Sequence, residues 1–517
     1  MSETQWVSAP SQNGQRWRAG TLLRLLKKEL SGRRPEWVMP SARHPRRVAA
    51  ATSRRSPVSR GRGALAWLAL TIAAALTLSG CATYAPLPLG SGRGASSVAQ
   101  LTAPTAAMPI PTLASHRFDP SDGLDATEVA MLAVANSPDL KVKRDELGIA
   151  RAQAFAAGLL PDPQLSLGED FPRHSGGGLV TAFNLGITED ITALLTRSSR
   201  MMTARSQTEQ VNLDLLWSEW QTVAQARLLF DQQLTLRAQQ ARLETEQAAL
   251  APVDHFVRMA LRAGNLTYDT ASAGLNAGAD VHKRLADNTI QLHQADSDLH
   301  VLLGLAPGAP LDLVGDPYQA TPTTAQVQQA LADLPRRRPD LLALQAGYQA
   351  QNAKLRGAIL AQFPALNLGF NTQRDTGNVY TNGFSLGITL PLFDRNRGNI
   401  AIEKATRQHL KDAYEARLLT TRSDMQRLLA DLATLDRQVA ALTAHARQLT
   451  DARRAAEQAW QAQLLDWPTY LAIRSNALSA DLDLLSVRQE QARQAIALQA
   501  LLGNTDIHPV PTQASTP

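Results

Sequence analysis

Two very long stretches of the chain carry apolar residues at helical spacing, interspersed with many Gln and Arg residues. They run from about 196 to 263 and from about 397 to 462, and each is followed by a break and a further helix of about 37 residues. Apolar positions such as Leu228, Leu234 and Leu243 are typical of packed helices with one wet side. At a rise of about 1.5 Å per residue, each long helix would extend roughly 100 Å.

Short segments with a different pattern interrupt the helices. FNLGIT begins at Phe183 and FSLGIT begins at Phe384, and both alternate a bulky apolar residue with a small or polar one. The segments Leu165–Leu167 and Leu366–Phe370 alternate in the same way. A period of two predicts strands, and the polar, Gly-containing stretches RHSGGG and RDTGN between them predict turns.

The spacing of these segments indicates a tandem duplication. Pro138 and Pro339 are 201 residues apart, as are Pro163 and Pro364 and the two phrases that begin FNLGIT and FSLGIT. Three matching islands at one offset are difficult to produce by chance. A fourth match, LLGL against LLGN, has an offset of 199 residues, so the later helices differ by a net two residues.

Each copy therefore has the same predicted order: a first helix, two strands, one long helix and one returning helix. In the first copy the first helix is expected over Leu124–Leu159, ending before Pro161. The returning helix would be roughly 55 Å long, too short to cover the long helix alone. We therefore expect one long helix to lie against two shorter helices stacked end to end.

Four strands cannot bury an apolar face or close a barrel by themselves, and their edges must pair with something. Small and polar residues, including Asn184, Gly186, Ser385 and Gly387, share one face. This is the pattern of a membrane barrel with a wet interior, which an oligomer could close; a trimer would supply twelve strands. A soluble sheet packed on the helices is the alternative. The residues predicted to face lipid are Leu165, Leu167, Phe183, Leu185, Ile187, Leu366, Leu368, Phe370, Phe384, Leu386 and Ile388.

The basic character of the chain is confined to its first 80 residues. These contain 14 Lys and Arg but 3 Asp and Glu, whereas the rest of the chain carries a net charge of −5. The pI near 9.6 therefore does not indicate a nucleic-acid surface. Residues 1–53 have no apolar periodicity, and we expect translation to start downstream, for example at Met39; cellular peptides from residues 1–38 would contradict this.

The rest of the leader is typical of a secretory signal. Basic residues Arg54, Arg55, Arg60 and Arg62 precede an apolar run, Ala64–Leu78, which is short for a bilayer span. The run leads into LSGC, which resembles the bacterial lipobox and implies cleavage between Gly80 and Cys81 and lipidation of Cys81, the one cysteine of the chain. Ala82 follows it, rather than an Asp that would signal retention in the inner membrane. An uncleaved anchor helix with an incidental cysteine is the alternative.

The motifs together resemble the TolC family of outer-membrane efflux proteins. They are the duplicated PDL, the Pro-then-strand islands, LGIT, and LPLFDRNRGNI over Leu390–Ile400; the last is similar to the cation-efflux, CzcC/CusC-like branch. The resemblance implies a mostly α fold with a small membrane β part. In that fold, a trimeric, 12-stranded outer-membrane β-barrel continues into a long periplasmic α-helical tunnel.

The leader, the duplication and the linker together predict six segments in the chain. Its segments are a basic leader and signal peptide over 1–80, a lipidated tether over 81–123, a first helix–hairpin–helix repeat over 124–304, an equatorial linker over 305–324, a second repeat over 325–503 and a C-terminal tail over 504–517.

The resemblance also assigns roles to the two helix breaks. They would be periplasmic tips at which an adaptor protein docks, formed by Arg262, Gly264, Leu266 and Thr267 in the first copy and by Gln463 and Leu465 in the second. Gln463 stands where the family has glycine. Asp269 and Asp466 would be candidate gate acids. The implied partners are a second and third copy of the chain, the adaptor, an inner-membrane proton-driven pump and outer-membrane lipid, with no nucleic acid and no cofactor.

No catalytic motif is present, and the implied function is passive conduction of a cargo out of the cell, metal cations included. His293, Asp296 and His300 are spaced like metal ligands, but the two histidines would lie roughly 10.5 Å apart along a helix, so we assign no metal site. Two alternatives stay open: an exit duct for type I secretion, and a non-conducting coiled-coil structural lipoprotein.

Overall fold

The computed structural model describes residues 84–502, apart from 104–107, 109, 174–177 and 318–321. The chain divides into two units between Leu89 and Gly90, and every helix and strand below lies in the second unit. The predicted cleavage and lipidation residues, Gly80 and Cys81, lie outside the described residues.

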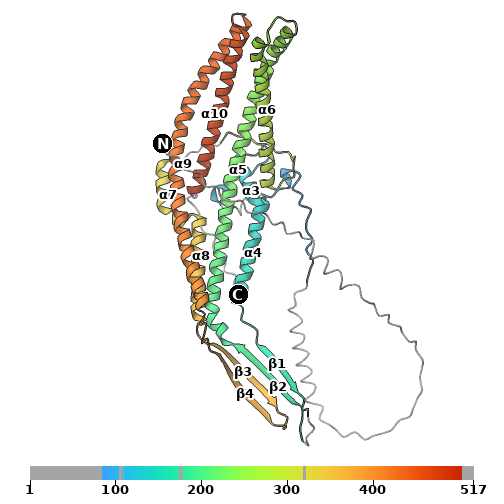
Figure 1. Ribbon diagram of the computed structural model, residues 1–517, viewed down its shortest axis with the longest axis vertical. Helices are drawn as coiled ribbons and strands as arrows, with labels where there is room; N and C mark the ends of the chain where they lie inside the picture. The colour runs from blue at the N-terminus through green and yellow to red at the C-terminus, as the bar shows by residue number, and fades with distance from the viewer. Residues whose placement is uncertain (1–83, 104–107, 109, 174–177, 318–321, 503–517) are drawn as a thin grey trace, which may run out of the picture. The chain divides into compact units, whose positions relative to one another are not determined.

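The first repeat contains four helices and two strands in the predicted order (Figure 1). Two short turns, η1 (Val98–Gln100) and α2 (Pro111–Ala114), precede it. Its elements are α3 (Ala126–Asn136), α4 (Pro138–Gly158), β1 (Gln164–Asp170), β2 (Ala182–Asp190), α5 (Ile191–Arg262) and α6 (Tyr268–Leu303).

The second repeat has the same succession of elements. They are α7 (Thr324–Arg337), α8 (Pro339–Leu360), β3 (Ala365–Arg374), β4 (Tyr380–Thr389), α9 (Arg397–Gln461) and α10 (Trp467–Leu502). The long helices α5 and α9 contain 72 and 65 residues, which is roughly 100 Å of helix each. The predicted strands and long helices are thus confirmed.

The prediction of one continuous first helix over Leu124–Leu159 is wrong. The segment is two helices, because the chain leaves helical geometry at Ser137, whose ψ is 125°. Ser137 accepts a hydrogen bond from the amide of Leu140, and Pro138 begins α4, where a missing amide hydrogen costs nothing. The second repeat breaks in the same way at Arg338, before Pro339.

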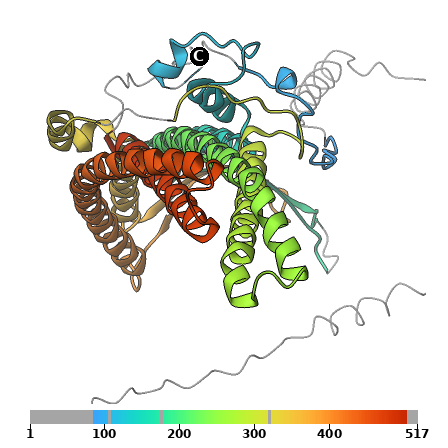
Figure 2. The same ribbon diagram turned by 90° about the horizontal axis from the view of Figure 1, so that it is seen from above.

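The helices form a wall of four columns, and α5 and α9 each run the length of one column. On the side of the wall nearer the strands, α4, α5, α8 and α9 are neighbours in that order; on the other side the order is α6, α5, α10 and α9 (Figures 1 and 2). Each long helix therefore lies against two shorter helices stacked end to end, as predicted. The edge columns of the wall are α4 with α6, and α9.

Buried apolar residues form three large clusters in the wall and a small fourth one around Leu140, Leu147 and Leu215. One cluster surrounds α3, the middle of α5 and the end of α6, and a second joins α7, α8, α9 and α10. The third lies near the α5–α6 and α9–α10 turns and contains residues from all four of those helices. Burial of these side chains, at about 25 cal/mol per Å², is the main term that holds the columns together.

A charged cluster joins the two repeats around Arg338, at the break between α7 and α8. Arg338 is fully buried, donates two hydrogen bonds to Asp340 and stacks over the ring of Trp217 from the first repeat at 4.7 Å. Arg417 also donates to Asp340, at 2.8 Å. Burial raises the pKa of Asp340, but the two arginines outweigh burial and lower the pKa overall. A cation between an aromatic face and a carboxylate is well compensated for its loss of water.

Candidate functional site

The four strands form one antiparallel sheet in the order β1-β2-β3-β4, at the end of the helical wall (Figure 1). Opposite residues in the register have side chains on the same face. Leu165 pairs with Ile187, Ile187 with Phe370, and Phe370 with Phe384. The eleven residues predicted to face lipid consequently share one face, which we call the apolar strand face.

The apolar strand face is uncovered in the single chain. Phe384 is 85% exposed and contacts Phe370 in a tilted arrangement with 5.3 Å between ring centroids, and Leu165, Leu167 and Leu386 are each more than 60% exposed. Contiguous apolar surface of this extent is unusual on a soluble monomer and marks a surface that another phase or chain covers. Nothing in the described residues packs over it as the soluble alternative requires.

The opposite side of the sheet is small and polar. Ser166, Gly186, Asn371 and Gly383 follow one another across the four strands, and Gly369 pairs with Ser385. A Cβ atom at Gly369 would lie 2.4 Å from the Ser385 hydroxyl, so this position accepts only glycine without a shift of its neighbour. We call this side the polar strand face.

The sheet ends in two strands that have one partner each. Within the described residues, β1 pairs only with β2, and β4 pairs only with β3. Each outer strand therefore presents a row of backbone groups that another strand can bind. Within the described residues the sheet is therefore open, with β1 and β4 as its two edges.

The two turns at the far end of the wall have the same backbone geometry. Gly264 has φ +71° and Gln463 has φ +58°, both in the left-handed region. In each turn two successive amides bond back to carbonyls of the preceding helix: Gly264 to Leu261 and Asn265 to Ala260 in the first. Gln463 thus has the backbone conformation of Gly264 at the equivalent turn, at a cost of about 1 kcal/mol or more.

The remaining predicted tip residues lie at or beside these turns. Arg262 is the last residue of α5, and Thr267 caps α6 by accepting a hydrogen bond from the amide of Thr270. Leu266 and Leu465 are partly buried against the third apolar cluster, while neighbouring Leu464 is 81% exposed.

The candidate gate acids have local structural roles in this chain. Asp466 accepts a hydrogen bond from the amide of Thr469 at 2.8 Å, and hydrogen bonds from Thr469 lower its pKa. Asp269 lies in the first turn of α6, where a carboxylate is favoured by the helix dipole. A gate role for either residue stays a prediction.

A buried ion-pair network near the tips was not predicted from the sequence. Arg474 of α10 donates to both carboxylate oxygens of Glu246 of α5, at 2.9 and 2.8 Å, and also to Glu457 of α9 at 2.9 Å. Tyr470 donates to Glu457 at 2.5 Å. The network joins helices of both repeats, and its partners are 228 residues apart in the chain.

The environment of this network keeps Arg474 charged. Burial alone would lower the pKa of Arg474, but the bonds to Glu246 outweigh it and raise the pKa. Burial, helped by the bond to Glu457, raises the pKa of Tyr470 to about 12. One signal in the sequence could have located the network: Arg474 interrupts an apolar stripe formed by Tyr470, Leu471, Ala477 and Leu478 at helical spacing.

The histidine pattern considered for a metal has another role in the structure. The ring nitrogens of His300 lie 2.6 Å from the Asp296 carbonyl oxygen and 2.7 Å from the Ala309 carbonyl oxygen, so both are engaged in hydrogen bonds. His300 thereby holds the linker against α6. Among the described residues, no group of three or more His, Cys, Asp or Glu side chains is arranged to hold a metal ion.

Comparison with known proteins supports the resemblance. Residues 327–504 match the outer membrane efflux protein family. The chain is 27% identical to the pyoverdine export outer membrane protein OpmQ of Pseudomonas aeruginosa, over 84% of this chain and 95% of OpmQ. It is 28% identical to outer membrane protein OprJ of the same species, over 43% of this chain and about half of OprJ.

A solved structure of CusC superposes with a TM-score of 0.62 at 19% sequence identity, covering 77% of this chain and 97% of CusC. The fold is that of a TolC-like outer-membrane efflux channel. These matches are to outer-membrane efflux proteins and to the fold of TolC-like channels, and the CzcC/CusC-like branch stays a prediction. Within the described residues, no helix has the length and apolar character needed to span a bilayer.

Proposed function

We propose that this protein is the outer-membrane exit duct of a tripartite efflux system and conducts its cargo passively. The observation that carries the proposal is the open four-stranded sheet, apolar on one face and polar on the other, at the end of a helical wall. Known relatives with this fold are outer-membrane efflux proteins. Channels of this kind need no catalytic residue, and we assign none.

We further propose that three copies assemble by pairing β1 of one chain with β4 of the next. Three sheets of four strands give a barrel within the size range of outer-membrane barrels. The apolar strand face would then contact lipid, and the polar strand face would line a wet lumen. The helical walls would continue the barrel into the periplasm as a tunnel, since each wall has two free edge columns.

The amino terminus would anchor the assembly in the outer membrane. Cleavage before Cys81 followed by acylation would attach lipid to that residue. The predicted tether over 81–123 is partly packed on the wall, since Ala95 pairs with Leu305 and Leu113 is fully buried, and its first part would link the lipid to the wall. We expect cells grown with labelled palmitate to incorporate label into the protein, and Cys81→Ala to abolish this. Label retained by the variant would exclude Cys81 as the lipidation site.

The other partners follow from the same proposal. The tips around Gly264 and Gln463 would contact a periplasmic adaptor, and a proton-driven pump in the inner membrane would supply the energy. Opening would be a rearrangement of helices at the tips. Two observations point to different cargo classes. The segment LPLFDRNRGNI is similar to the cation-efflux branch and favours metal cations, whereas the relative OpmQ is named for pyoverdine export.

A measurement of ion conduction distinguishes the proposed duct from a non-conducting structural lipoprotein and from a soluble sheet packed on the helices. We expect purified protein to migrate as a trimer and to produce discrete single-channel currents in planar bilayers. Intact trimers without any current under applied voltage, or a stable monomer, would contradict the proposal. A type I secretion duct would also conduct, so transport assays with metal salts and with secreted polypeptides distinguish these two cargo classes.

A further inference from the structure

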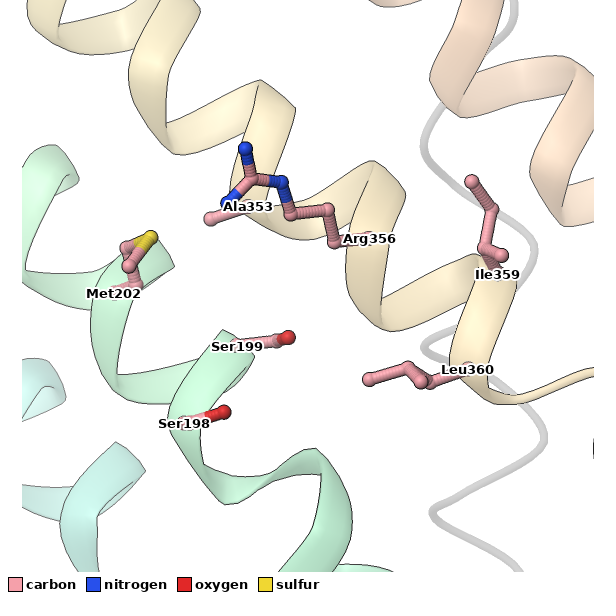
Figure 3. A pocket seen from close by; sticks show the side chains of 7 residues that line it. All are labelled: Ser198, Ser199, Met202, Ala353, Arg356, Ile359 and Leu360. Atoms are coloured by element: carbon pink, nitrogen blue, oxygen red, sulfur yellow. The ribbon is translucent and has the colours of Figure 1, made fainter.

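A groove on the wall, close to the strands, has no role in the function proposed above. It lies between α5 of the first repeat and α8 of the second, and has a volume of about 390 Å³ (Figure 3). This volume is at the lower end of the range for ligand pockets. We propose that the groove binds an anionic phospholipid of the periplasmic leaflet, with the phosphate at Arg356. The inference rests on the proposed membrane orientation of the sheet.

The lining has two chemical parts that match the two parts of a phospholipid. Met202, Ile359 and Leu360 contribute apolar surface and are 51%, 38% and 40% exposed. Arg356 and the hydroxyls of Ser198 and Ser199 contribute the polar part (Figure 3). An acyl chain would contact the apolar side chains, and the phosphate would bind the Arg356 guanidinium.

Arg356 is a cation without a counter-ion in the part of the chain that the structure describes. It has no hydrogen bond or ion pair there, in contrast to the nearby Lys354, which pairs with Glu403 at 3.1 Å. Guanidinium groups match phosphate oxygens in geometry and charge, and charge-assisted hydrogen bonds of this kind are among the strongest. Arg356 is exposed as well as unpaired, and its place in the lining of the groove, which Arg407 does not share, makes it accessible to an anionic group bound there.

The position of the groove agrees with the head-group layer. Beyond the strands, exposed apolar residues continue on several chain segments: Leu160, Leu195, Phe363 and Phe393. These side chains would extend the lipid-covered surface past the ends of the strands. Ser198 and Ser199 lie about one helical turn beyond Leu195, or roughly 5 Å, and the head-group layer is about 5–7 Å thick on each side of a bilayer.

Neighbouring subunits would not cover this groove. Within one chain, α5 has α4 on its other side and α8 has α9 on its other side. The groove is thus in the middle of the wall, whereas a subunit interface would use the edge columns. A Cβ atom added at Gly357 of α8 would lie 3.5 Å from the Cβ of Ser199, an ordinary contact distance, so the two helices are close together beside the groove.

The test is lipid binding to delipidated full-length protein, measured by native mass spectrometry with added phosphatidylglycerol or phosphatidylethanolamine. We expect phosphatidylglycerol to bind preferentially and Arg356→Gln to weaken its binding at least tenfold, with Arg356→Lys intermediate. The matched control is Arg407→Gln on α9, because Arg407 is also exposed and has no hydrogen bond or ion pair among the described residues; this variant should bind as the unchanged protein does. Circular dichroism checks that each variant keeps its helices.

Three results would overturn the lipid site. These are equal phosphatidylglycerol binding by Arg356→Gln and the unchanged protein, full displacement of the lipid by millimolar inorganic phosphate, and displacement by a transported cargo, which would make the groove a cargo site. Single-channel recording on the same protein separates the two proposals. A conducting protein without lipid preference contradicts only the lipid site, whereas a protein without conductance contradicts the proposed function itself.

Discussion

Replacing Leu386 with lysine is expected to reduce the yield of assembled trimer in outer-membrane fractions by at least tenfold. Leu386 lies near the middle of β4 on the apolar strand face and is 62% exposed. In the proposed barrel it would contact the centre of the bilayer. A lysine there costs about 2–4 kcal/mol per chain, and each trimer would contain three such residues.

The adjacent residue provides the matched control. Ser385 is on the same strand but on the polar strand face, opposite Gly369. Ser385→Lys should assemble normally and change ion selectivity in single-channel recordings, because its charge would lie in the lumen. Assembly measured by heat-modifiable electrophoresis compares the two variants directly. Equal assembly of both would argue against a lipid-facing side, and loss of the Ser385 variant alone would reverse the orientation of the barrel.

The strands were predictable because their signal is local. The alternation in FNLGIT and FSLGIT can be recognised without knowledge of the tertiary structure. The pairing register of the strands places the bulky apolar residues of both segments on one face. The left-handed conformation of Gln463 was not predicted, although the later offset of 199 residues aligns it with Gly264, and both have positive φ.

Two features were missed for different physical reasons. The break at Ser137 could have been predicted from the local sequence, because a residue before proline disfavours helical geometry. Pro138 and Pro339 were used as evidence of duplication, but they also mark the ends of α3 and α7. The network around Arg474 depends on tertiary packing, which brings Glu246 across from another repeat. An arginine within an apolar stripe indicates that a partner exists, but not which one.

That network gives the second large expected effect. Arg474→Met should leave the Glu246 carboxylate, which is 2% exposed, in the apolar cluster without its partner. Removing one member of a buried pair costs about 3–5 kcal/mol. Because Glu246 belongs to α5 and Arg474 to α10, the loss falls on the contact that holds the two tips together. We expect amide hydrogen exchange near the tips to accelerate about 100-fold or more, and channel openings to become more frequent.

Two further variants separate this effect from a general loss of stability. Arg493→Met is in the same helix and breaks an exposed pair with Glu490, which costs at most about 1 kcal/mol, so exchange at the tips should change little. Glu246→Leu combined with Arg474→Met removes both charges and should recover most of the protection, because apolar side chains can replace a buried ion pair. If the single and double variants exchange equally fast, the ion pair does not hold the tips together. If Arg474→Met changes exchange but not opening, the tips are joined by the network without gating the channel.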